Sequence, residues 1–280
     1  MSTIDYKTAF ICPVCGSNFN ISTHQFVCEK NHSFDIAKDG YCNLLVARGR
    51  STHGDNREMV VARREFLSLG HYRPLADRVA TLTLESTSCG AGVLDAGCGE
   101  GYYTATVETA LYERDGRSDV YAFDISKDAA SRCAKRNPRI HTAVAGSYRM
   151  PFSDGSIATV INTFSPMAED EVWRVLMPGG RFILAVPDAD HLIDLKAIIY
   201  DEPYRNALRD PQISGFTLVS DERLRYPFTL TSSAEVTSLF MMTPYAYRTS
   251  SIGRERVKAI DRLTVTADFH IYVYEKTEKR

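Results

Sequence analysis

The sequence predicts an α/β protein with a Rossmann-like, mixed seven-stranded sheet, preceded by a small metal-binding module. Short apolar runs alternate with helical patterns from Ala91 onward, which is typical of a parallel sheet covered by helices on both faces. Two late segments, residues 216–228 and 263–276, alternate in strand fashion and predict an antiparallel edge. Four of the seven cysteines lie in the first 42 residues, and they predict the separate module.

The composition fits one large domain, or a domain plus a small module. Of the 280 residues, 44% are hydrophobic and 24% charged, so the chain can bury a sizeable core and is not disordered. The formal net charge of −2 gives no global polycation signal. No apolar run approaches the roughly 20 residues that a membrane span needs, and the first ten residues lack a signal-peptide core. We therefore expect a cytoplasmic protein without membrane contact.

The chain is expected to divide after residue 45. Residues 1–45 form a turn-rich zinc-binding module, and residues 46–280 hold a polar linker, two helices and the α/β domain. The two helices are expected at residues 57–69 and 74–84, the second with a proline in its first turn.

The α/β domain is expected to alternate strands and helices. Strands are predicted at 93–97, 120–125, 141–145, 157–164 and 181–186, and helices at 103–113, 126–136, 168–176, 190–200 and 233–241. With the two late segments, these make the seven predicted strands. In such sheets, ligands bind outside the carboxyl ends of the parallel strands, so the loops leaving those ends are the candidate site.

The N-terminal cysteines have the spacing of a metal site. Cys12 and Cys15 form a C-x2-C pair, and Cys28 and His32 follow with a C-x3-H spacing. Three thiolates and one imidazole form a tetrahedral Zn²⁺ set. Four protein ligands leave no position for water, so the zinc is expected to be structural. The alternatives are reduced thiols that bind nothing, or Cys42 as a substitute ligand.

A glycine-rich loop follows the first strand of the α/β domain. Residues 95–103 read DAGCGEGYY, in which Gly97, Gly99 and Gly101 alternate with other residues. These glycines allow a sharp turn and the close approach of a ligand before a helix N-terminus. A dinucleotide site more usually reads G-x-G-x-x-G. The early third glycine and the carboxylate of Asp95 favour S-adenosylmethionine (AdoMet), which is cationic and has no pyrophosphate.

Three later segments complete the predicted cofactor site. Asp124 ends the second strand, where a carboxylate can accept hydrogen bonds from both ribose hydroxyls. Ser147 lies in the loop that would cover the adenine. The segment at 162–166, NTFSP, leaves the fourth strand, where a methyl acceptor would meet the sulfonium. The alternatives are a dinucleotide site or a vestigial loop and, for Phe164, packing in the core.

These motifs resemble those of a known family. VLDAGCGEGYYT, YAFDIS, MPFSDGS and MPGGRFILAVP resemble the class I AdoMet-dependent methyltransferases. CPVC…CEKNH, SFDIAKDGYCNLL, GHYRPL, PDADHLIDLKAIIY and MTPYAYR extend the resemblance, over about residues 10–276, to the bacterial 23S rRNA (guanine-N1)-methyltransferases of the RlmA type. A zinc module joined to a methyltransferase fold by GHYRPL is a specific combination.

The resemblance implies methyl transfer to N1 of a guanine in a 23S rRNA hairpin, with the zinc module helping to hold the RNA. Residues matching the family's AdoMet contacts are Tyr72, Gly99, Glu100 and His191, and Tyr102 is counted with the same loop. One branch modifies guanine 745 and tends to carry the loop found here at residues 98–103, so we favour 745. The other branch modifies guanine 748 and is tied to macrolide resistance. Ser165 replaces the family's usual alanine, and its hydroxyl is either neutral or contacts the guanine edge.

The sequence leaves the catalytic groups open. Guanine N1 keeps its proton at neutral pH, so a general base or a polarising contact to O6 is needed. Glu169, Asp170 and His191 are candidates by proximity only, and none is ranked as catalytic. The candidates for positioning the guanine are Phe164, Ser165 and Pro166. Stacking on an extruded base by Tyr102, Tyr103 and Phe164 is weighed against packing beneath the cofactor loop.

Two basic segments are candidates for RNA contact despite the overall charge. The first holds Arg48, Arg50, Arg57, Arg63, Arg64 and Arg73, and the second holds Arg132, Lys135, Arg136, Arg139 and Arg149. These residues could contact phosphates, and solvated helix faces are the alternative. The rival functions are a small-molecule methyltransferase and a non-enzymatic RNA-binding scaffold. A homodimer stays open.

Overall fold

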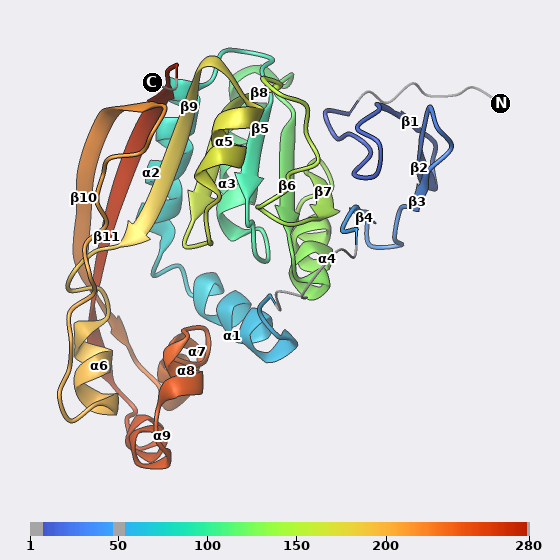
Figure 1. Cartoon of the computed structure of the whole chain (residues 1–280). Helices are drawn as coiled ribbons and strands as arrows, with labels where there is room; N and C mark the ends of the chain where they lie inside the picture. The colour runs from blue at the N-terminus through green and yellow to red at the C-terminus, as the bar shows by residue number, and fades with distance from the viewer. Residues whose placement is uncertain (1–7, 47–53, 279–280) are drawn as a thin grey trace.

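The computed structural model describes residues 8–46 and 54–278 and shows an α/β domain with a small N-terminal module at one side (Figure 1). Within these residues the main sheet has eight strands in the order β10-β11-β9-β8-β5-β6-β7-β4. The central parallel strands are β5 (Val93–Ala96), β6 (Val120–Asp124), β7 (His141–Val144), β8 (Ile157–Thr163) and β9 (Leu176–Pro187). β11 (Leu263–Lys276) pairs antiparallel with β9 and with β10 (Phe216–Leu230), which confirms the antiparallel edge.

The prediction of seven strands is one strand short. The additional strand, β4 (Tyr41–Asn43), belongs to the N-terminal segment and pairs parallel with β7 through Tyr41 opposite Thr142. An edge strand such as β7 offers unpaired backbone groups, and a neighbouring segment can satisfy them. Three residues are too few to show a strand pattern in sequence. The division after residue 45 stays a prediction, with β4 forming a link between its two parts.

Helices cover both faces of the main sheet. They are α1 (Arg57–Ser68), α2 (Arg73–Ser86), α3 (Tyr102–Asp115), α4 (Lys127–Arg136), α5 (Glu169–Val175), α6 (Ile193–Ile199), α7 (Ser233–Met241), α8 (Tyr245–Arg248) and α9 (Ser251–Lys258). Successive strand residues point to opposite faces, so Val93 packs with α2 and α3 whereas Leu94 packs with α5 and the module. The two apolar clusters on either side of the sheet form the core.

Local sequence explains several helix ends. Ser126 caps α4 by accepting a hydrogen bond from the amide of Ala129, and Asn56 caps α1 in the same way through Met59. The predicted helix at 190–200 begins only at Ile193, because Leu192 adopts a left-handed conformation with φ of 56°. The short helices α8 and α9 were not predicted.

The N-terminal module contains a three-stranded antiparallel sheet. Its strands are β1 (Phe19–Ile21), β2 (Gln25–Cys28) and β3 (Ser33–Asp35). The module is fastened to the large domain by Phe10, whose ring lies 5.0 Å from that of Phe152 and 5.4 Å from that of Tyr121. An aromatic contact and a shared strand therefore hold the module against one edge of the main sheet.

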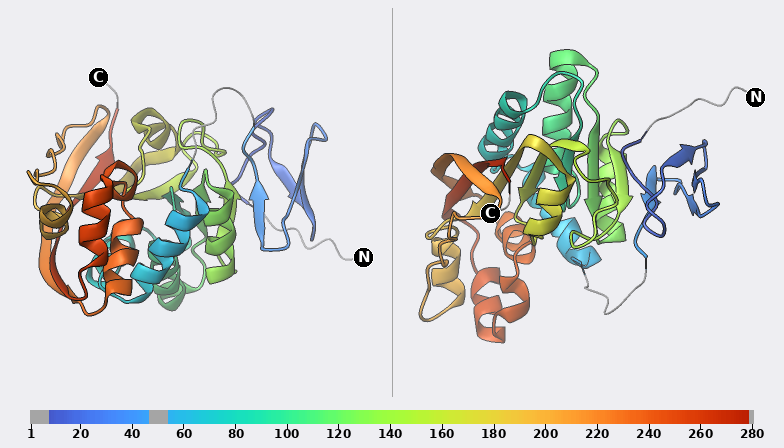
Figure 2. Two further views of the ribbon diagram at one scale, coloured as in Figure 1. Left: turned by 90° about the horizontal axis from the view of Figure 1, so that it is seen from below. Right: turned by 45° about the horizontal axis from the view of Figure 1, so that its top comes forward.

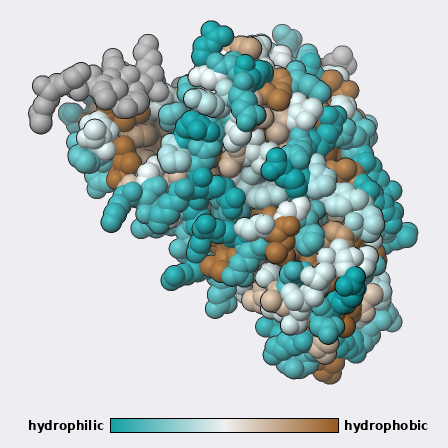
Figure 3. All heavy atoms as spheres, turned by 180° about the vertical axis from the view of Figure 1, so that it is seen from behind, coloured by the Kyte–Doolittle hydropathy of each residue, from teal (hydrophilic) through white to brown (hydrophobic). Residues whose placement is uncertain are grey.

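The parallel strands end toward α1 and α7–α9, so these helices lie near the expected site (Figure 1). Seen from below, the same helices lie across the carboxyl ends of the parallel strands (Figure 2). From behind, the surface is mostly hydrophilic, and apolar side chains form separate small patches (Figure 3). In the described parts of the chain, no helix is both long and apolar enough to cross a membrane.

Candidate zinc centre and methyl-transfer site

The four predicted zinc ligands converge at one point of the module. The ligand atoms of Cys12, Cys15, Cys28 and His32 all lie within 4.8 Å of one another. The Cys28 Sγ atom is 3.3 Å from His32 Nδ1, and the Cys15 Sγ atom is 3.6 Å from Cys28 Sγ. Ligands bound to one ion at about 2.0–2.3 Å in tetrahedral geometry are separated by such distances. The donor set therefore fits a structural Zn²⁺.

Two tight turns bring the ligands together. Gly16 has φ of 75° and donates its amide hydrogen to the Cys12 carbonyl at 2.8 Å, and Asn31 makes the matching bond to Cys28. The hydrogen bond between the side chains of Cys15 and Ser17 is the main cause that lowers the pKa of the Cys15 thiol to about 6. This pKa favours the thiolate that a metal needs.

Cys42 lies outside this cluster. Its side chain is buried, and burial raises the pKa of the thiol to about 12. A thiol that stays protonated is a poor metal ligand. Among the described residues the metal cluster contains Cys12, Cys15, Cys28 and His32, as the spacing predicted, and Cys42 packs in the core.

The glycine loop turns sharply between β5 and α3. Gly97 and Gly101 have φ of 93° and 85°, values that favour glycine. Space is also restricted there: a methyl group on Gly97 would overlap the Ser165 side chain, and one on Gly101 would lie 2.8 Å from Cys133 Sγ. The Gly99 amide donates a hydrogen bond of 2.9 Å to Asp124 Oδ2. Backbone geometry and neighbouring side chains therefore both require glycine at positions 97 and 101.

Asp95 is buried near the end of β5, and one of its two carboxylate oxygens has no hydrogen-bond partner. Thr104 donates a hydrogen bond of 2.5 Å to Oδ2, whereas Oδ1 has no hydrogen-bond partner. Burial raises the pKa of the Asp95 carboxyl to about 7, the bond from Thr104 opposes the rise, and the charge of Asp124 adds to it. Unpaired buried polar atoms are rare in folded proteins. The Oδ1 atom therefore indicates a site for a polar or cationic ligand.

Two more buried polar atoms without partners belong to the same region. They are the hydroxyl of Tyr103, in the first turn of α3, and Oδ1 of Asn162, near the end of β8. Asn162 donates through Nδ2 to the Ala96 carbonyl at 2.9 Å, which joins β8 to the start of the glycine loop. Asn162 was predicted only as part of the segment 162–166, and Thr104 was not predicted. The position of Asn162 at a parallel strand's carboxyl end was the available signal for it.

Asp124 lies beside the loop, as predicted. Its Oδ1 atom accepts a hydrogen bond of 2.8 Å from the Ser126 amide, and Oδ2 accepts the bond from Gly99. Burial raises the pKa of Asp124, and these two backbone hydrogen bonds oppose the rise. Each oxygen keeps a further lone pair. The carboxylate is thus held in place and can still accept hydrogen bonds from a ligand.

Glu100 has a partner within the protein. The buried Glu100 carboxylate forms an ion pair with Arg136 of α4, and the Arg136 Nε also donates to the Glu100 carbonyl at 3.2 Å. Its second oxygen, Oε1, has no partner. The ion pair fixes the loop to α4, so this side chain supports the loop, and contact with AdoMet through Oε1 or the backbone stays a prediction.

Tyr72 and His191 meet although 119 positions separate them. The Tyr72 hydroxyl lies 3.2 Å from His191 Nε2, and His191 Nδ1 accepts the Asp268 amide hydrogen at 3.3 Å. This acceptor role of Nδ1 assigns the ring proton to Nε2. Burial lowers the pKa of His191 to about 3, so the ring is neutral. In this arrangement neither ring nitrogen is free to accept a proton from guanine.

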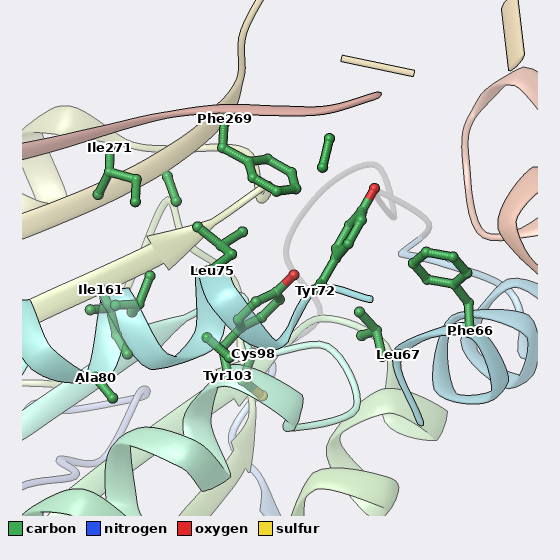
Figure 4. Packing of buried hydrophobic residues seen from close by; sticks show 14 of the residues in the cluster. Phe66, Leu67, Tyr72, Leu75, Ala80, Cys98, Tyr103, Ile161, Phe269 and Ile271 are labelled. Atoms are coloured by element: carbon green, nitrogen blue, oxygen red, sulfur yellow. The ribbon is translucent and has the colours of Figure 1, made fainter. Parts of the chain in front are cut away.

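Aromatic rings surround the segment that leaves β8. Phe164 has φ of 60° and is 38% exposed, and its ring stacks on that of His191 at 6.3 Å. The same ring lies 5.5 Å from that of Phe269 and 6.2 Å from that of Tyr103. Tyr72, Tyr103 and Phe269 come from three elements and their rings gather in one region (Figure 4). Phe164 thus combines an exposed surface with aromatic support beneath it.

The remaining predicted residues lie at the margins of this site. Ser147 is half-buried in the turn after β7, where Gly146 and Arg149 are bridged. Tyr102 is half-buried, and its ring meets that of Tyr103 edge-on at 5.2 Å. Glu169, at the start of α5, forms an ion pair of 2.6 Å with Arg209. Nothing in these contacts gives Glu169 the role of a base.

The fold and the two sites together define a class I AdoMet-dependent methyltransferase with an N-terminal zinc ribbon. The family model described as RlmA, N-terminal, a zinc ribbon, matches residues 10–52, and a methyltransferase domain model matches residues 93–180. Both matches agree with the observed zinc cluster and glycine loop.

Curated relatives identify the family. A Micromonospora griseorubida protein, provisionally named a 23S rRNA (guanine-N1)-methyltransferase, is 34% identical over 94% of this chain and 96% of its own length. A Streptomyces fradiae protein named 23S rRNA (guanine(748)-N1)-methyltransferase is 34% identical over 76% of this chain and 77% of its own. A Bacillus subtilis protein with a provisional name of the same kind is 30% identical over 97% of this chain and 98% of its own. The chain belongs to the 23S rRNA (guanine-N1)-methyltransferase family of the RlmA type.

Proposed function

We propose that this protein transfers a methyl group from AdoMet to N1 of guanine 745 in a hairpin of 23S rRNA. The supporting observation is the combination of a zinc ribbon with an intact cofactor loop in one chain, since small-molecule methyltransferases rarely need such a ribbon. The names of the relatives support 23S rRNA and N1 of guanine. The loop at residues 98–103 supports position 745.

The neighbouring guanine 748 is the second candidate. It is favoured by the name of the Streptomyces fradiae relative, which covers 76% of this chain. The two positions call for the same cofactor chemistry and differ only in which base of the hairpin enters the site. The experiment below distinguishes them directly.

The buried carboxylates prepare the site for a cation. When bound, AdoMet supplies an electrophilic methyl group on a sulfonium. The ionised Asp95 carboxylate would offset positive charge beside the loop through its unpartnered Oδ1, and Asp124 would accept hydrogen bonds from ribose hydroxyls. Because charges interact strongly in a buried site, each carboxylate contributes more to binding there than at the surface. Tyr72, Gly99, Glu100, Tyr102 and His191 are proposed to line the same site.

The acceptor side is proposed to be aromatic. The exposed part of the Phe164 ring would stack on the extruded guanine, while the rings of His191 and Phe269 hold it from behind. Ser165, packed against Gly97, and Pro166 would set the path of the backbone between cofactor and base. Holding two reactants in line accounts for much of the rate of such transfers. We assign Phe164, Ser165 and Pro166 to positioning of the guanine. His191 is likewise assigned to positioning rather than to proton removal, because its ring is neutral and both of its nitrogens are engaged.

Primer extension on 23S rRNA from cells with and without the gene tests the proposal. Methylation at N1 blocks Watson–Crick pairing, so reverse transcriptase should stop one nucleotide before the modified base. A gene-dependent stop at 745 supports the proposed position, and a stop at 748 moves the enzyme to the second candidate. If no stop depends on the gene, 23S rRNA is not the substrate and a small-molecule acceptor becomes the better account.

A further inference from the structure

A hollow between α1 and α4 brings together cations from both basic segments of the sequence. Its volume is about 250 Å³, and its charged lining residues are Arg57, Arg64, Arg132, Lys135 and Asp128, with Ser131 beside them. The two helices are far apart in the chain, but they lie against each other in the fold. Four cations and one acid give the hollow a net positive charge.

Three of the four cations in the hollow differ from five other basic residues of the two segments, which are already paired. Five basic residues of the two segments form ion pairs within the protein: Arg63 with Asp55, Arg73 with Asp77, Lys135 with Asp39, Arg136 with Glu100, and Arg139 with Glu108. By contrast, the part of the chain that the structure describes offers Arg57, Arg64 and Arg132 no ion pair. Arg48 and Arg50 lie outside the described residues. Three cations without such pairs, Arg57, Arg64 and Arg132, therefore line one hollow.

Lys135 connects the hollow to the N-terminal module. Its Nζ atom lies 2.9 Å from Asp39 Oδ1, and the Ser131 hydroxyl donates to Asp39 Oδ2 at 2.6 Å. The hydrogen bond from Ser131, followed by the bond from Lys135, lowers the pKa of Asp39. Both oxygens of the Asp39 carboxylate therefore have partners. Asp128 is the acidic residue among those that line the hollow.

The other end of the hollow lies beside the cofactor loop. The Ser126 hydroxyl donates to the Asp55 carbonyl at 3.0 Å, which joins the start of α4 to the segment before α1. Arg64 also acts electrostatically on the Glu100 carboxyl, where together with Arg136 it opposes the rise in pKa that burial causes. The hollow is thus linked to Asp39 of the N-terminal module through Lys135 and to Glu100 of the cofactor loop through Arg64.

We propose that this hollow binds a backbone phosphate of the RNA substrate, using the guanidinium groups of Arg57, Arg64 and Arg132. A phosphodiester carries one negative charge, and its two free oxygens match the fork of a guanidinium. A contact of this kind fixes the register of the RNA without reading its bases. It would hold the strand between the ribbon and the site where the guanine enters. This inference rests on the proposed function, because it takes RNA as the substrate.

The test compares RNA binding by Arg64→Gln, Arg132→Gln and the double variant across a range of salt concentrations. The probe is a synthetic RNA of the 23S hairpin that contains guanines 745 and 748. Loss of one phosphate contact lowers the slope of log affinity against log salt by about 0.7–0.9, so the double variant, which abolishes the proposed contact, should lose about this amount. We expect its affinity for the hairpin near physiological salt to fall roughly tenfold. AdoMet affinity should change far less, because Arg64 acts on Glu100 of the cofactor loop only through its charge.

Matched variants separate charge at this position from charge in general. Arg117→Gln removes one exposed cation from the loop that enters β6, at the amino end of the parallel strands, and should leave the slope unchanged. Arg64→Lys with Arg132→Lys keeps the charge and should retain most of the salt dependence. Calorimetric AdoMet binding checks that each variant is folded.

Two results would overturn the inference. If wild-type protein methylates the hairpin, but the double Gln variant keeps the wild-type slope, the hollow does not bind phosphate and the proposed function survives. If wild-type protein neither binds nor methylates the hairpin while it binds AdoMet, the RNA function fails and the phosphate site fails with it.

Discussion

The zinc ribbon and the methyltransferase domain obtain their order in different ways. In the ribbon, four ligand atoms within 4.8 Å of one another organise strands of only three or four residues. In the larger domain, an eight-stranded sheet buries apolar side chains on both faces, and a polar site lies at the carboxyl ends of its strands. A short segment that cannot bury enough apolar surface needs a metal, whereas a large sheet does not. The two regions should therefore fail differently when single residues are changed.

Their boundary is a set of specific contacts. Phe10 packs on Phe152, β4 extends the main sheet, and the Ala9 amide donates to the Tyr121 hydroxyl at 3.1 Å. Tyr121 and Phe152 belong to the core on the α5 side of the sheet, away from the glycine loop. Unfolding of the ribbon should therefore disturb that edge and leave the cofactor loop in place.

Removing a zinc ligand should have the largest effect. Cys28→Ala takes one of four ligands from the ribbon, and because zinc binding is worth roughly 10 kcal/mol or more to such modules, the ribbon should unfold. We expect zinc content to fall to near zero and methylation of the RNA hairpin to fall at least about a hundredfold, while AdoMet affinity changes little. Metal analysis, hairpin methylation and calorimetry measure the three quantities.

Cys89→Ala is the matched control, because Cys89 is exposed and outside the metal cluster. It should keep zinc and activity. A loss of AdoMet binding in Cys28→Ala equal to the loss of methylation would show that the two regions are not separable in this way.

The second prediction concerns the backbone of the cofactor loop. In Gly97→Ala, the new methyl group would meet both Cβ and Oγ of Ser165 at a φ of 93°, so rotation of the serine cannot relieve the overlap. Strain and overpacking each cost about 1–3 kcal/mol, which predicts roughly a hundredfold weaker AdoMet binding. Calorimetry measures it, and zinc content should stay unchanged.

Gly90→Ala separates strain from overlap. Gly90 has a similar φ of 76°, but no atom lies within 4 Å of the position of its added methyl group. This variant should lose about 1 kcal/mol of stability and keep wild-type AdoMet affinity. Equal AdoMet affinities for the two alanine variants would show that Ser165 does not constrain the loop.

The difference between local and long-range contacts explains what could be predicted from the sequence. The zinc ligands were predicted because C-x2-C and C-x3-H spacings encode local turns. The glycine loop was predicted because it directly follows a buried strand, and Asp124 because it ends one. Such signals need only neighbouring residues. β4 was missed because its three residues become a strand only by pairing with β7, about a hundred residues later.

Interactions between distant residues were the hardest to predict. Nothing near Glu100 in sequence shows that Arg136 neutralises it, and the pairing of Arg139 with Glu108 is equally hidden. The second basic segment therefore looks like one cluster in the sequence, although Arg136 and Arg139 have partners inside the protein and Arg132 lines the surface hollow. The contact of Tyr72 with His191 likewise depends on the fold and was not predicted, and the two residues themselves were named from the resemblance alone.

The third prediction uses the pKa of Asp95. Its folded pKa of about 7 lies above the usual value of 3.8, so its stabilising contribution is present below pH 4 and is lost as the pH rises through 7. A cationic ligand favours the ionised form, so AdoMet affinity should rise about thirtyfold between pH 5.5 and 8 and then level off. Asp95→Asn should bind AdoMet more weakly and without this pH dependence, which calorimetry at several pH values measures. A wild-type affinity that is flat over this range would contradict the role of Asp95.

Phe164→Ala should have the smallest effect, confined to the acceptor side of the site. The ring is 38% exposed above His191 and Phe269, so its removal takes away a stacking surface and leaves the glycine loop untouched. Base–aromatic stacking contributes about 1–3 kcal/mol, which predicts roughly tenfold slower methylation at unchanged AdoMet affinity. Phe164→Tyr keeps the ring and should retain most of the activity. Equal losses of methylation and AdoMet binding in Phe164→Ala would instead assign the ring to packing beneath the cofactor, and the division between cofactor and acceptor sides would then fail at this residue.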